Sequence, residues 1–323
     1  MFKRNGIIGG KGIGIQGLSS NTLHNILLPI PPITEQYKIV EKIELLIEEI
    51  NKYEIKKIEL DQLESELQPQ LKKSILQYAI QGKLVPQIEG EESASVLLEK
   101  IQQEKQKLVK EGKLKKKDLV ESRIFKGEDN KYYEQIGNEV NCIEEEIPFE
   151  IPESWRWVRF KNLVQFSLGK TPERGNSLYW SPNDCPWVSI ADMEDKTALI
   201  KTKEFISKKA LKEKFGNIYS PIGTLIMSFK LTIGKVSILE IDAVHNEAII
   251  SIFPFITDEN IIRNYLFNFL SIITSYTAST DAIKGATLNS KKISEMLVPL
   301  PPLEEQRRIV EKITKINQGI ESI

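Results

Sequence analysis

The residues of this 323-residue chain best suited to chemistry are polar side chains gathered at three turn-like places. They combine cations with groups that donate and accept paired hydrogen bonds, which is what contact with phosphates and base edges requires. The first place holds Lys170, Thr171, Arg174, Asn176 and Tyr179, the second Ser189 and Asp192, and the third Lys230, Thr232, Lys235 and Asn246. A single polar turn residue is more often solvent-facing, so the prediction rests on the grouping.

Covalent and metal chemistry find little support in the same sequence. Cys142 and Cys185 are the only cysteines, and they stand far apart with no histidine close to either. We therefore expect two free thiols, with neither a disulfide framework nor a zinc site. His24 and His245 lack metal-ligand spacing, and structural roles are expected for both.

A glycine-rich run near the N-terminus formally matches G-x-G-x-x-G at Gly12, Gly14 and Gly17. A dinucleotide fingerprint follows a buried strand and opens a helix. Only a few residues precede this run, and residues 19–21 follow it as a turn. Lys11 is followed by glycine instead of serine or threonine, so the run is not a P-loop. We interpret it as a glycine-rich strand and turn.

Composition indicates a globular chain of about two domains. The net charge is −1, with 41% hydrophobic and 28% charged residues. Residues 151–300 carry 18 basic and 15 acidic side chains, including six lysines between Lys201 and Lys214 that could meet phosphates or form a solvated face. No run approaches the ~20 apolar residues of a membrane span, and no signal-peptide core is present. A cytoplasmic location is the default expectation.

An internal repeat organises the elements that must position these groups. PIPPITEQYKIVEKI, at residues 29–43, returns as PLPPLEEQRRIVEKI at residues 299–313. Each copy has a Pro-Pro step running into an apolar-periodic segment, and proline is well tolerated in the first turn of a helix. Each copy therefore predicts a helix start, from Thr34 and from Glu304.

The first predicted helix is long, because apolar residues recur at four- and three-residue steps from Ile39 to Ile75. This is coiled-coil spacing, with Pro69 expected to break or restart the helix and Gly82 to stop it. A dimerisation coil and a spacer between two domains both fit. A second helix is predicted from Ser93 to Glu111, ended by Gly112. Residues 118–150 are polar, acidic and aperiodic.

From Trp155 the chain changes to short alternating segments typical of strands, followed by an apolar helix candidate at residues 261–275. We predict an α+β fold with long coiled-coil helices. The expected parts are a domain tail (1–28), a long spacer helix (29–82), a helical and polar connecting segment (83–148), a complete globular domain (149–300) and the start of a distal helix (301–323).

The chain resembles the specificity subunits of Type I restriction-modification enzymes. The resemblance is carried by both repeat copies, by LKKSILQYAIQGKLVPQ (71–87), by SASVLLEKIQQEKQKLVKEGKLKK (93–116) and by EEIPFEIPESWRWVRF (145–160). It implies that each target-recognition domain precedes a long helix, that the helices pair antiparallel, and that each domain reads one half of a split DNA target. It also implies a chain without its own active site or cofactor. S-adenosylmethionine, ATP and Mg would be bound only by the modification and restriction subunits.

The resemblance also implies a departure. A full member would carry a complete first recognition domain ahead of Pro29 and a distal helix running past Ile323. We therefore expect a shortened member, and two such chains could pair their helices into a homodimer.

Two other interpretations differ in class. A stand-alone enzyme would need a nucleophile, metal cluster or cofactor loop in adequate context, and the sequence has no Asn-Pro-Pro-Tyr type methyltransferase motif. A coiled-coil scaffold without DNA binding explains the helices, but it does not explain a complete α+β domain between two repeat copies. The DNA target itself is not readable from residue types, because it depends on loop geometry and DNA shape.

Overall fold

A computed structural model describes residue 24 and residues 28–120, 122–280 and 288–321. The chain divides into two compact units, Met1–Leu67 and Gln68–Ile323, which are taken separately below. The glycine-rich run and nearly all of the expected domain tail lie outside the described residues. The fold class is α+β, as predicted.

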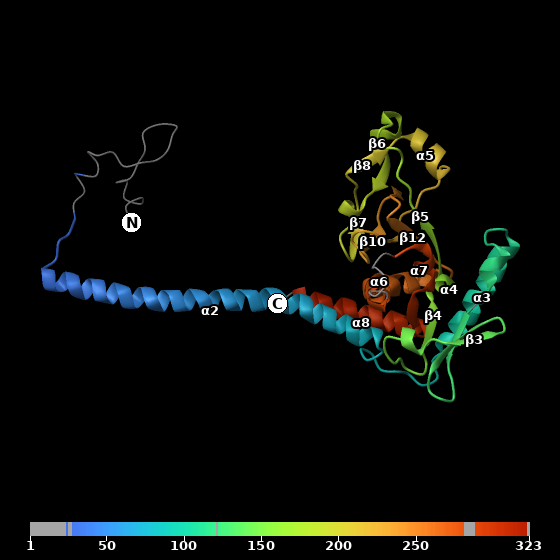
Figure 1. The fold of residues 1–323 in the computed structure, drawn as a ribbon, viewed down its shortest axis with the longest axis horizontal. Coiled ribbons are helices and arrows are strands. Elements are labelled where there is room, and N and C mark those ends of the chain that lie inside the picture. The colour runs from blue at the N-terminus through green and yellow to red at the C-terminus, as the bar shows by residue number, and fades with distance from the viewer. Residues whose placement is uncertain (1–23, 25–27, 121, 281–287, 322–323) are drawn as a thin grey trace. The chain divides into compact units, whose positions relative to one another are not determined.

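The long helix α2 (Ile33–Ile80) begins in the first unit and ends in the second (Figure 1). Its entry is fixed by Gln36, whose backbone N–H donates to Pro32 O at 3.0 Å and whose side-chain amide donates to Pro31 O at 2.8 Å. The expected break at Pro69 was wrong, because α2 continues through it. An interior proline removes one helical hydrogen bond, but the Glu, Gln, Leu and Lys residues around it favour helix.

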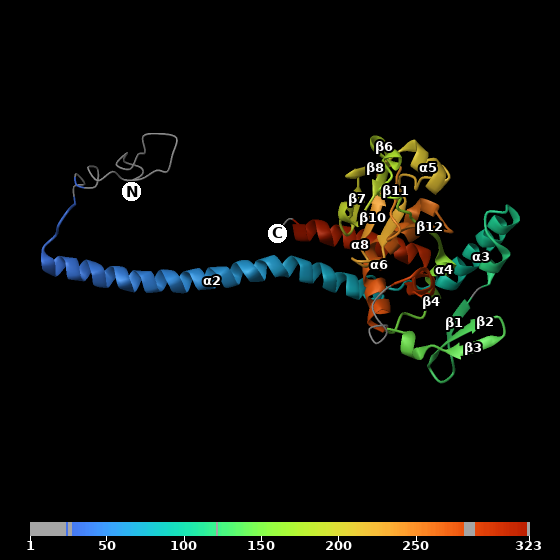
Figure 2. The same ribbon diagram turned by 45° about the horizontal axis from the view of Figure 1, so that its top comes forward.

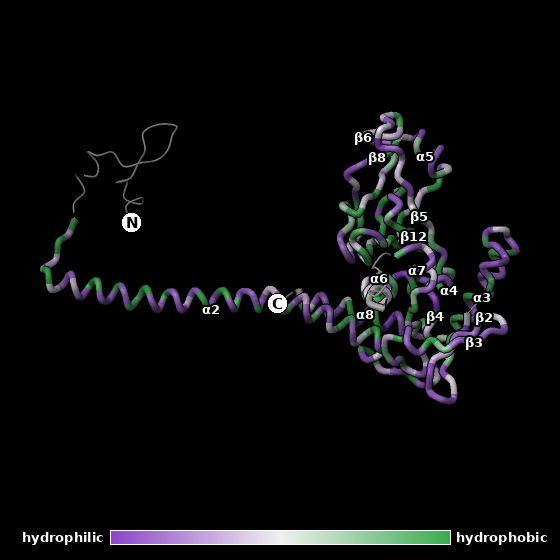
Figure 3. Tube along the Cα trace, in the orientation of Figure 1, coloured by the Kyte–Doolittle hydropathy of each residue, from purple (hydrophilic) through white to green (hydrophobic). Residues whose placement is uncertain are grey.

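Apolar side chains recur along α2 with the predicted spacing and are exposed from Ile39 to Leu67. Figure 3 shows hydrophobic stretches alternating with hydrophilic ones along the helix. An exposed apolar face of this length is typical of a helix that packs against a partner.

The second unit is built on a five-stranded sheet (Figure 2). Its order is β5 (Val164–Leu168), β12 (Ile249–Pro254), β9 (Leu225–Ser228), β10 (Val236–Leu239) and β7 (Thr197–Leu199). β7 joins β10 in parallel, and the other neighbours are antiparallel. Helix α6 (Ile261–Thr280) packs on the sheet and buries Tyr265, Phe269 and Ile273. Their spacing of four residues places them on one helix face.

A smaller sheet has the order β11 (Val244–His245), β6 (Trp180–Val188) and β8 (Glu204–Ile206). Helix α5 (Lys208–Phe215) covers it. Ser207 caps this helix by accepting a hydrogen bond from Ala210 N at 3.1 Å, and Gly216 ends it in the left-handed conformation. Trp187, Ile206 and Leu211 form the centre of a separate small core.

The remaining elements join segments distant in sequence. β4 (Arg156–Arg159) pairs antiparallel with β13 (Leu297–Leu300), and α4 (Phe160–Leu163), α7 (Ser290–Glu295) and α8 (Leu303–Glu321) flank this pair. Helix α3 (Ala94–Lys110) has Ser93 as its N-cap and stops before Gly112, close to the predicted bounds. The C-terminal end of α2 and the helices α3 and α8 contribute side chains to the core beneath α6. The predicted boundary at residue 149 stays a prediction.

The second repeat copy reproduces the local structure of the first. Gln306 donates through its backbone and side-chain amides to the carbonyls of the Pro-Pro step, at 3.0 and 2.9 Å. The surroundings differ, because Ile309 and Ile313 are 0% and 2% exposed whereas Ile39 and Ile43 are 43% and 49% exposed. One local sequence therefore encodes one helix entry in two environments.

Residues 118–150 correct the sequence prediction. They contain an antiparallel three-stranded meander of β1 (Ser122–Lys126), β2 (Tyr132–Ile136) and β3 (Glu139–Cys142). The short 3-10 helices η1 (Lys116–Leu119) and η2 (Glu144–Glu146) lie on either side of it. Ile124, Tyr132 and Ile143 pack against the indole of Trp157. The strands are short and mostly polar, so their alternation is too weak to read in the sequence.

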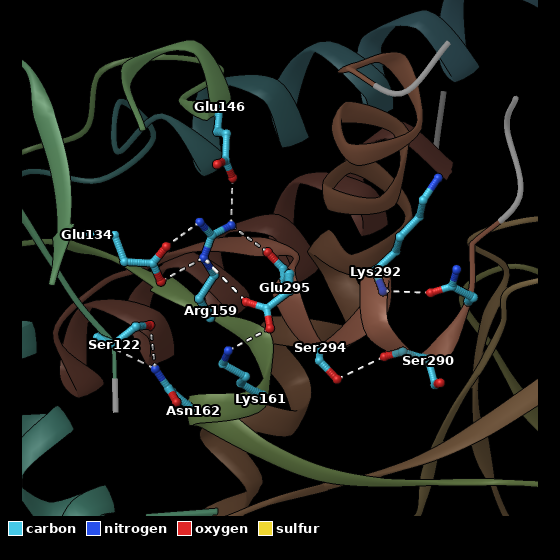
Figure 4. A network of polar contacts seen from close by, with 11 residues as sticks. Ser122, Glu134, Glu146, Arg159, Lys161, Asn162, Ser290, Lys292, Ser294 and Glu295 are labelled. Carbon is cyan, nitrogen blue, oxygen red and sulfur yellow. Dashed lines mark hydrogen bonds and ion pairs between the residues drawn. The ribbon is translucent and has the colours of Figure 1, made fainter. Parts of the chain in front are cut away.

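A buried ion-pair network ties this meander to β4 (Figure 4). Arg159 donates to both carboxylate oxygens of Glu134, at 3.0 and 2.6 Å, to Glu146 at 2.7 Å and to the backbone carbonyl of Glu295 at 2.8 Å. Burial works against both charges, but the hydrogen bonds outweigh it. They raise the pKa of Arg159 and lower the pKa of Glu134.

Candidate nucleic-acid interface

The first predicted cluster lies in the loop between β5 and β6. The first residues of this loop are held against β11. At Gly169 a Cβ would lie 2.1 Å from the carbonyl oxygens of His245 and Asn246, so only glycine fits. The backbone N–H of Lys170 donates to His245 O at 2.8 Å, and the indole of Trp187 donates to Lys170 O at 3.0 Å. The loop therefore leaves the sheet from a fixed point.

Arg174 is the best-positioned cation of the loop. Its guanidinium carbon lies 4.1 Å from the ring centre of Trp180 and 4.8 Å from that of Trp187. It forms an ion pair with both carboxylate oxygens of Glu204, and this hydrogen bonding raises the pKa of Arg174. The side chain is half-exposed, so the two indoles and Glu204 orient the guanidinium and leave part of it open to solvent.

Glu247 brings the first and third clusters together. Its carboxylate accepts a hydrogen bond from the Thr171 hydroxyl, which lowers the pKa of Glu247 together with the nearby charges of Lys230 and Arg174. The two loops therefore meet around one ionised carboxylate. Thr171, Arg174 and Lys230 are all exposed there.

The second cluster lies beside this meeting point because β11 runs parallel to β6, pairing His245 with Val188. Asn246 follows directly and donates its backbone N–H to Val188 O at 3.0 Å, which places it next to Ser189. The hydroxyl and backbone N–H of Ser189 donate to Asp192 at 2.7 and 2.9 Å. Ser189 and Asp192 thus fix the strand end and the turn η4 (Ile190–Asp192).

The third cluster divides in the structure. Lys230 and Thr232 stand exposed in the turn after β9, which Ser228 closes by donating its hydroxyl to Thr232 O at 2.5 Å. Lys235 turns away and donates its Nζ to Met193 O at 3.1 Å. Lys235 therefore joins the second cluster.

Two predicted residues support the loop from within. Asn176 caps the turn η3 (Ser177–Tyr179) by accepting from Leu178 N at 3.1 Å. Tyr179 is buried and donates its hydroxyl to Glu213 at 2.7 Å, which raises its pKa. Its ring lies beneath the ammonium of Lys214. The burial of Tyr179 disfavours the predicted base contact and fits a packing role.

The sequence prediction missed Glu204 and Glu247. Both are acidic and lie outside the three predicted groups, and cations and amides are the types best suited to phosphates and bases. A carboxylate can also accept a hydrogen bond from cytosine N4. The one sequence clue to Glu247 was that it directly follows the predicted residue Asn246.

The buried polar centre beneath the loops is structural. His245 lies within hydrogen-bond distance of the Ser251 hydroxyl, at 2.5 Å, and Ser251 is 2.5 Å from Ser220. All three side chains are buried, and burial lowers the pKa of His245 to about 4. A serine this deeply buried cannot meet a substrate, so the pair has no nucleophilic use. The structural role expected for His245 is confirmed.

Cys142 is exposed and Cys185 is buried, and both are free. Within the described ranges, no group of three or more His, Cys, Asp or Glu side chains is placed to hold a metal ion. The described helices also include none that is long and apolar enough to cross a membrane.

Comparison with known proteins places these features in a family. The model of the Type I restriction modification DNA specificity domain matches residues 152–323. The chain is 43% identical over 99 residues to the Type I restriction enzyme EcoAI specificity subunit of Escherichia coli, covering 31% of this chain and 14% of that protein. It is 33% identical over 136 residues to the EcoEI specificity subunit of Escherichia coli, covering 42% and 18%.

Among solved structures, the HsdS subunit from Thermoanaerobacter tengcongensis matches with 19% identity and a TM-score of 0.44, covering 97% of this chain and 58% of that one. An α+β domain with exposed polar loops describes the class of protein. The chain belongs to the Type I restriction modification DNA specificity family, whose model covers more than half of it. The matched region spans less than a fifth of the EcoAI and EcoEI subunits.

Proposed function

We propose that this chain recognises one half of a bipartite DNA target through the loop surface around Arg174. The surface consists of the exposed side chains of Lys170, Thr171, Arg174, Lys230 and Thr232, with Asn246 at the adjoining strand end. The family match supports sequence recognition as its role.

The arrangement of Arg174 carries this proposal. Two indoles and Glu204 fix the guanidinium plane while leaving the side chain half-exposed. Glu204 accepts from Nη1 and Nη2, so the Nε–H and its neighbouring Nη hydrogen are the donors left for bidentate contact with guanine O6 and N7, the commonest specific base contact. Lys230 and Lys170, on neighbouring loops, suit phosphate contacts that set the register.

We further propose that the chain has no active site of its own and acts with partner subunits. In this proposal the modification subunits bind S-adenosylmethionine and methylate adenine, and the restriction subunit uses ATP and Mg. The complex would work on double-stranded DNA in the cytoplasm. The similarity to specificity subunits of Type I restriction enzymes supports this proposal.

The test is a mobility-shift titration of the chain assembled with its modification subunits, at fixed salt. Arg174→Ala should weaken target binding by about 1–3 kcal/mol and relax discrimination at one position, whereas Lys230→Ala should weaken binding evenly across sequences. Arg123→Ala, at an exposed arginine on β1, is the matched control and should leave binding unchanged. If all three variants bound the target as tightly as the unaltered chain, the loop surface would be removed from the proposal.

The exposed apolar face of α2 supports a second, separate proposal, that α2 pairs with another long helix, in a homodimer or a mixed pair. Sedimentation of the isolated chain over a wide concentration range measures self-association. A strict monomer would exclude the homodimer. A scaffold role without DNA binding predicts self-association together with no mobility shift in the assembled complex.

A further inference from the structure

A hollow of about 300 Å³ lies at the end of the main sheet opposite to the recognition loops. The register decides this: β12 pairs Ile249 with Ser228 at one end and Ile252 with Leu225 at the other. Lys230 follows β9 at its Ser228 end, whereas Gly223 and Thr224 precede β9 at its Leu225 end. The residues that line the hollow include Pro221, Ile222, Phe253, Pro254, Ile256 and Arg263. Whatever occupies the hollow therefore leaves the recognition loops free.

Arg263, in the first turn of α6, is the one cation among the residues that line this hollow. Its Nη1 donates to Gly223 O at 3.0 Å, and its Nε and Nη2 donate to the side-chain oxygen of Asn264 at 3.2 and 3.0 Å. Both acceptors are neutral, and a guanidinium has five N–H donors. Two donors thus remain, within a guanidinium that neighbouring oxygens hold in place.

The charge of Arg263 is uncompensated in the described part of the chain. Arg159 and Arg174 each pair with a carboxylate, whereas no described carboxylate forms an ion pair with Arg263. Burial lowers the pKa of Arg263, with no opposing contribution from a nearby negative charge. A partly buried cation without a counter-ion favours an anionic occupant.

The rim of the hollow indicates what kind of molecule carries that anion. Ile222 is 64% exposed and Phe253 is 36% exposed, beside two prolines. The nearby carboxylates are already engaged: Asp242 accepts from Ile222 N at 2.9 Å, and Glu259, two residues before α6, forms an ion pair with Arg307. A single cation among apolar side chains disfavours a phosphate backbone, which needs several cations. These side chains suit a protein surface with one inserted acidic side chain.

We propose that this hollow is a docking site for a partner protein that inserts a single carboxylate side chain, flanked by an apolar residue, against Arg263 and Ile222. The carboxylate receives the two remaining N–H groups, and its apolar neighbour covers the exposed Ile222 and Phe253. Docking here leaves the Arg174 surface accessible to DNA.

The experiment follows the side-chain Nε–Hε signals of the full chain by NMR while a probe is added. The probes are acetyl-Leu-Glu-amide, its uncharged match acetyl-Leu-Gln-amide, inorganic phosphate and a DNA duplex. The acidic dipeptide should move the Arg263 signal saturably and bind about tenfold more tightly than the uncharged one, the value of one charged hydrogen-bonded contact. The Arg123 signal should stay in place.

Two variants separate the parts of the site. Arg263→Gln should remove the preference for the acidic dipeptide, and its thermal unfolding reports whether the fold is retained. Ile222→Ser changes an exposed side chain, so the fold is kept, and it should weaken both dipeptides alike. Equal binding of the two dipeptides to the unaltered chain would overturn the proposal. Phosphate binding as tight as the acidic dipeptide, or a shift of the Arg263 signal by the duplex, would also overturn it.

Discussion

Trp155 donates its indole N–H to the carboxylate of Glu305 at 2.9 Å, across 150 residues of sequence. Gln87 donates to the same carboxylate at 2.6 Å. Glu305 lies in the first turn of α8, Trp155 precedes β4, and Gln87 lies between α2 and α3. One buried carboxylate therefore holds together the entry of the globular domain, its exit helix and the segment that follows the long helix.

This contact predicts a particular pH dependence. Burial raises the pKa of Glu305 above 4.5, against the lowering effect of its hydrogen bonds with Trp155 and Gln87. The folded chain thus holds this proton to higher pH than the unfolded chain. The resulting stability is fully present below the ordinary carboxyl pKa and is lost as pH rises through the raised folded value.

The variant Glu305→Gln removes this titration. Urea unfolding of both proteins between about pH 4 and pH 7 should show the stability of the native chain, relative to the variant, falling as pH rises. A difference in unfolding free energy that is constant over this range, or that grows with pH, would contradict the assignment.

Gly169 and Gly175 lie in one loop and make a matched pair. A methyl group at Gly169 would clash with two carbonyl oxygens, whereas nothing lies within 4 Å of a Cβ at Gly175. Gly169→Ala should destabilise the second unit by about 1–3 kcal/mol, and Gly175→Ala should stay within about 0.5 kcal/mol. Thermal unfolding measures both. Equal effects would mean that the loop start is not held as described.

The two repeat copies allow identical substitutions in different environments. Ile309 is fully buried, so Ile309→Ala should cost about 2–5 kcal/mol of unfolding free energy. Ile39, its counterpart, is exposed in the isolated chain, and Ile39→Ala should cost less than about 0.5 kcal/mol. Denaturation at low protein concentration distinguishes them. A large cost at Ile39 that grows with concentration would reveal a helix partner.

Removing one member of the Arg159 network should be severe. Arg159→Ala leaves the buried carboxylate of Glu134 without its partner, and breaking a buried pair costs about 3–5 kcal/mol. Lys161→Ala, at a half-buried pair with Glu295 in the same network, should cost about 1 kcal/mol or less. Urea denaturation tests the order, and comparable losses would argue against a buried network.

Glu247 should restrain non-specific binding. The Thr171 hydrogen bond lowers its pKa, so it is ionised at neutral pH where the loops meet. Glu247→Gln keeps an acceptor for Thr171 but removes the charge that repels phosphates. Affinity for a non-target duplex should rise roughly two- to fivefold, while Glu240→Gln, at the other end of the sheet, should change nothing. Weaker binding of the duplex by Glu247→Gln would contradict this role and would indicate that the carboxylate contacts a DNA base.

Local energetics explain how much of the fold was readable in the sequence. The bounds of α3 follow from a serine before the helix and a glycine after it, and α6 follows from its apolar period. The repeat also predicted two equivalent helix entries from its Pro-Pro steps, and in both copies a Gln amide donates to a Pro-Pro carbonyl five residues away. Pro69 and the β1–β3 meander were misjudged because the propensity of neighbouring residues and distant packing outweighed the local signals.

The sequence by itself determined the helix entries, the α+β class and the polar loops, since these depend on contacts between near neighbours. Only the tertiary structure decided which loops meet. Parallel pairing of β11 with β6 sets Asn246 beside Ser189, and the carboxylate of Glu247 then joins Thr171 to the Lys230 turn. The orientation of Arg174 on two indoles and the burial of Glu305 likewise depend on side-chain packing across distant strands and helices. Such pairings are fixed by register and shape complementarity, which no short stretch of sequence contains.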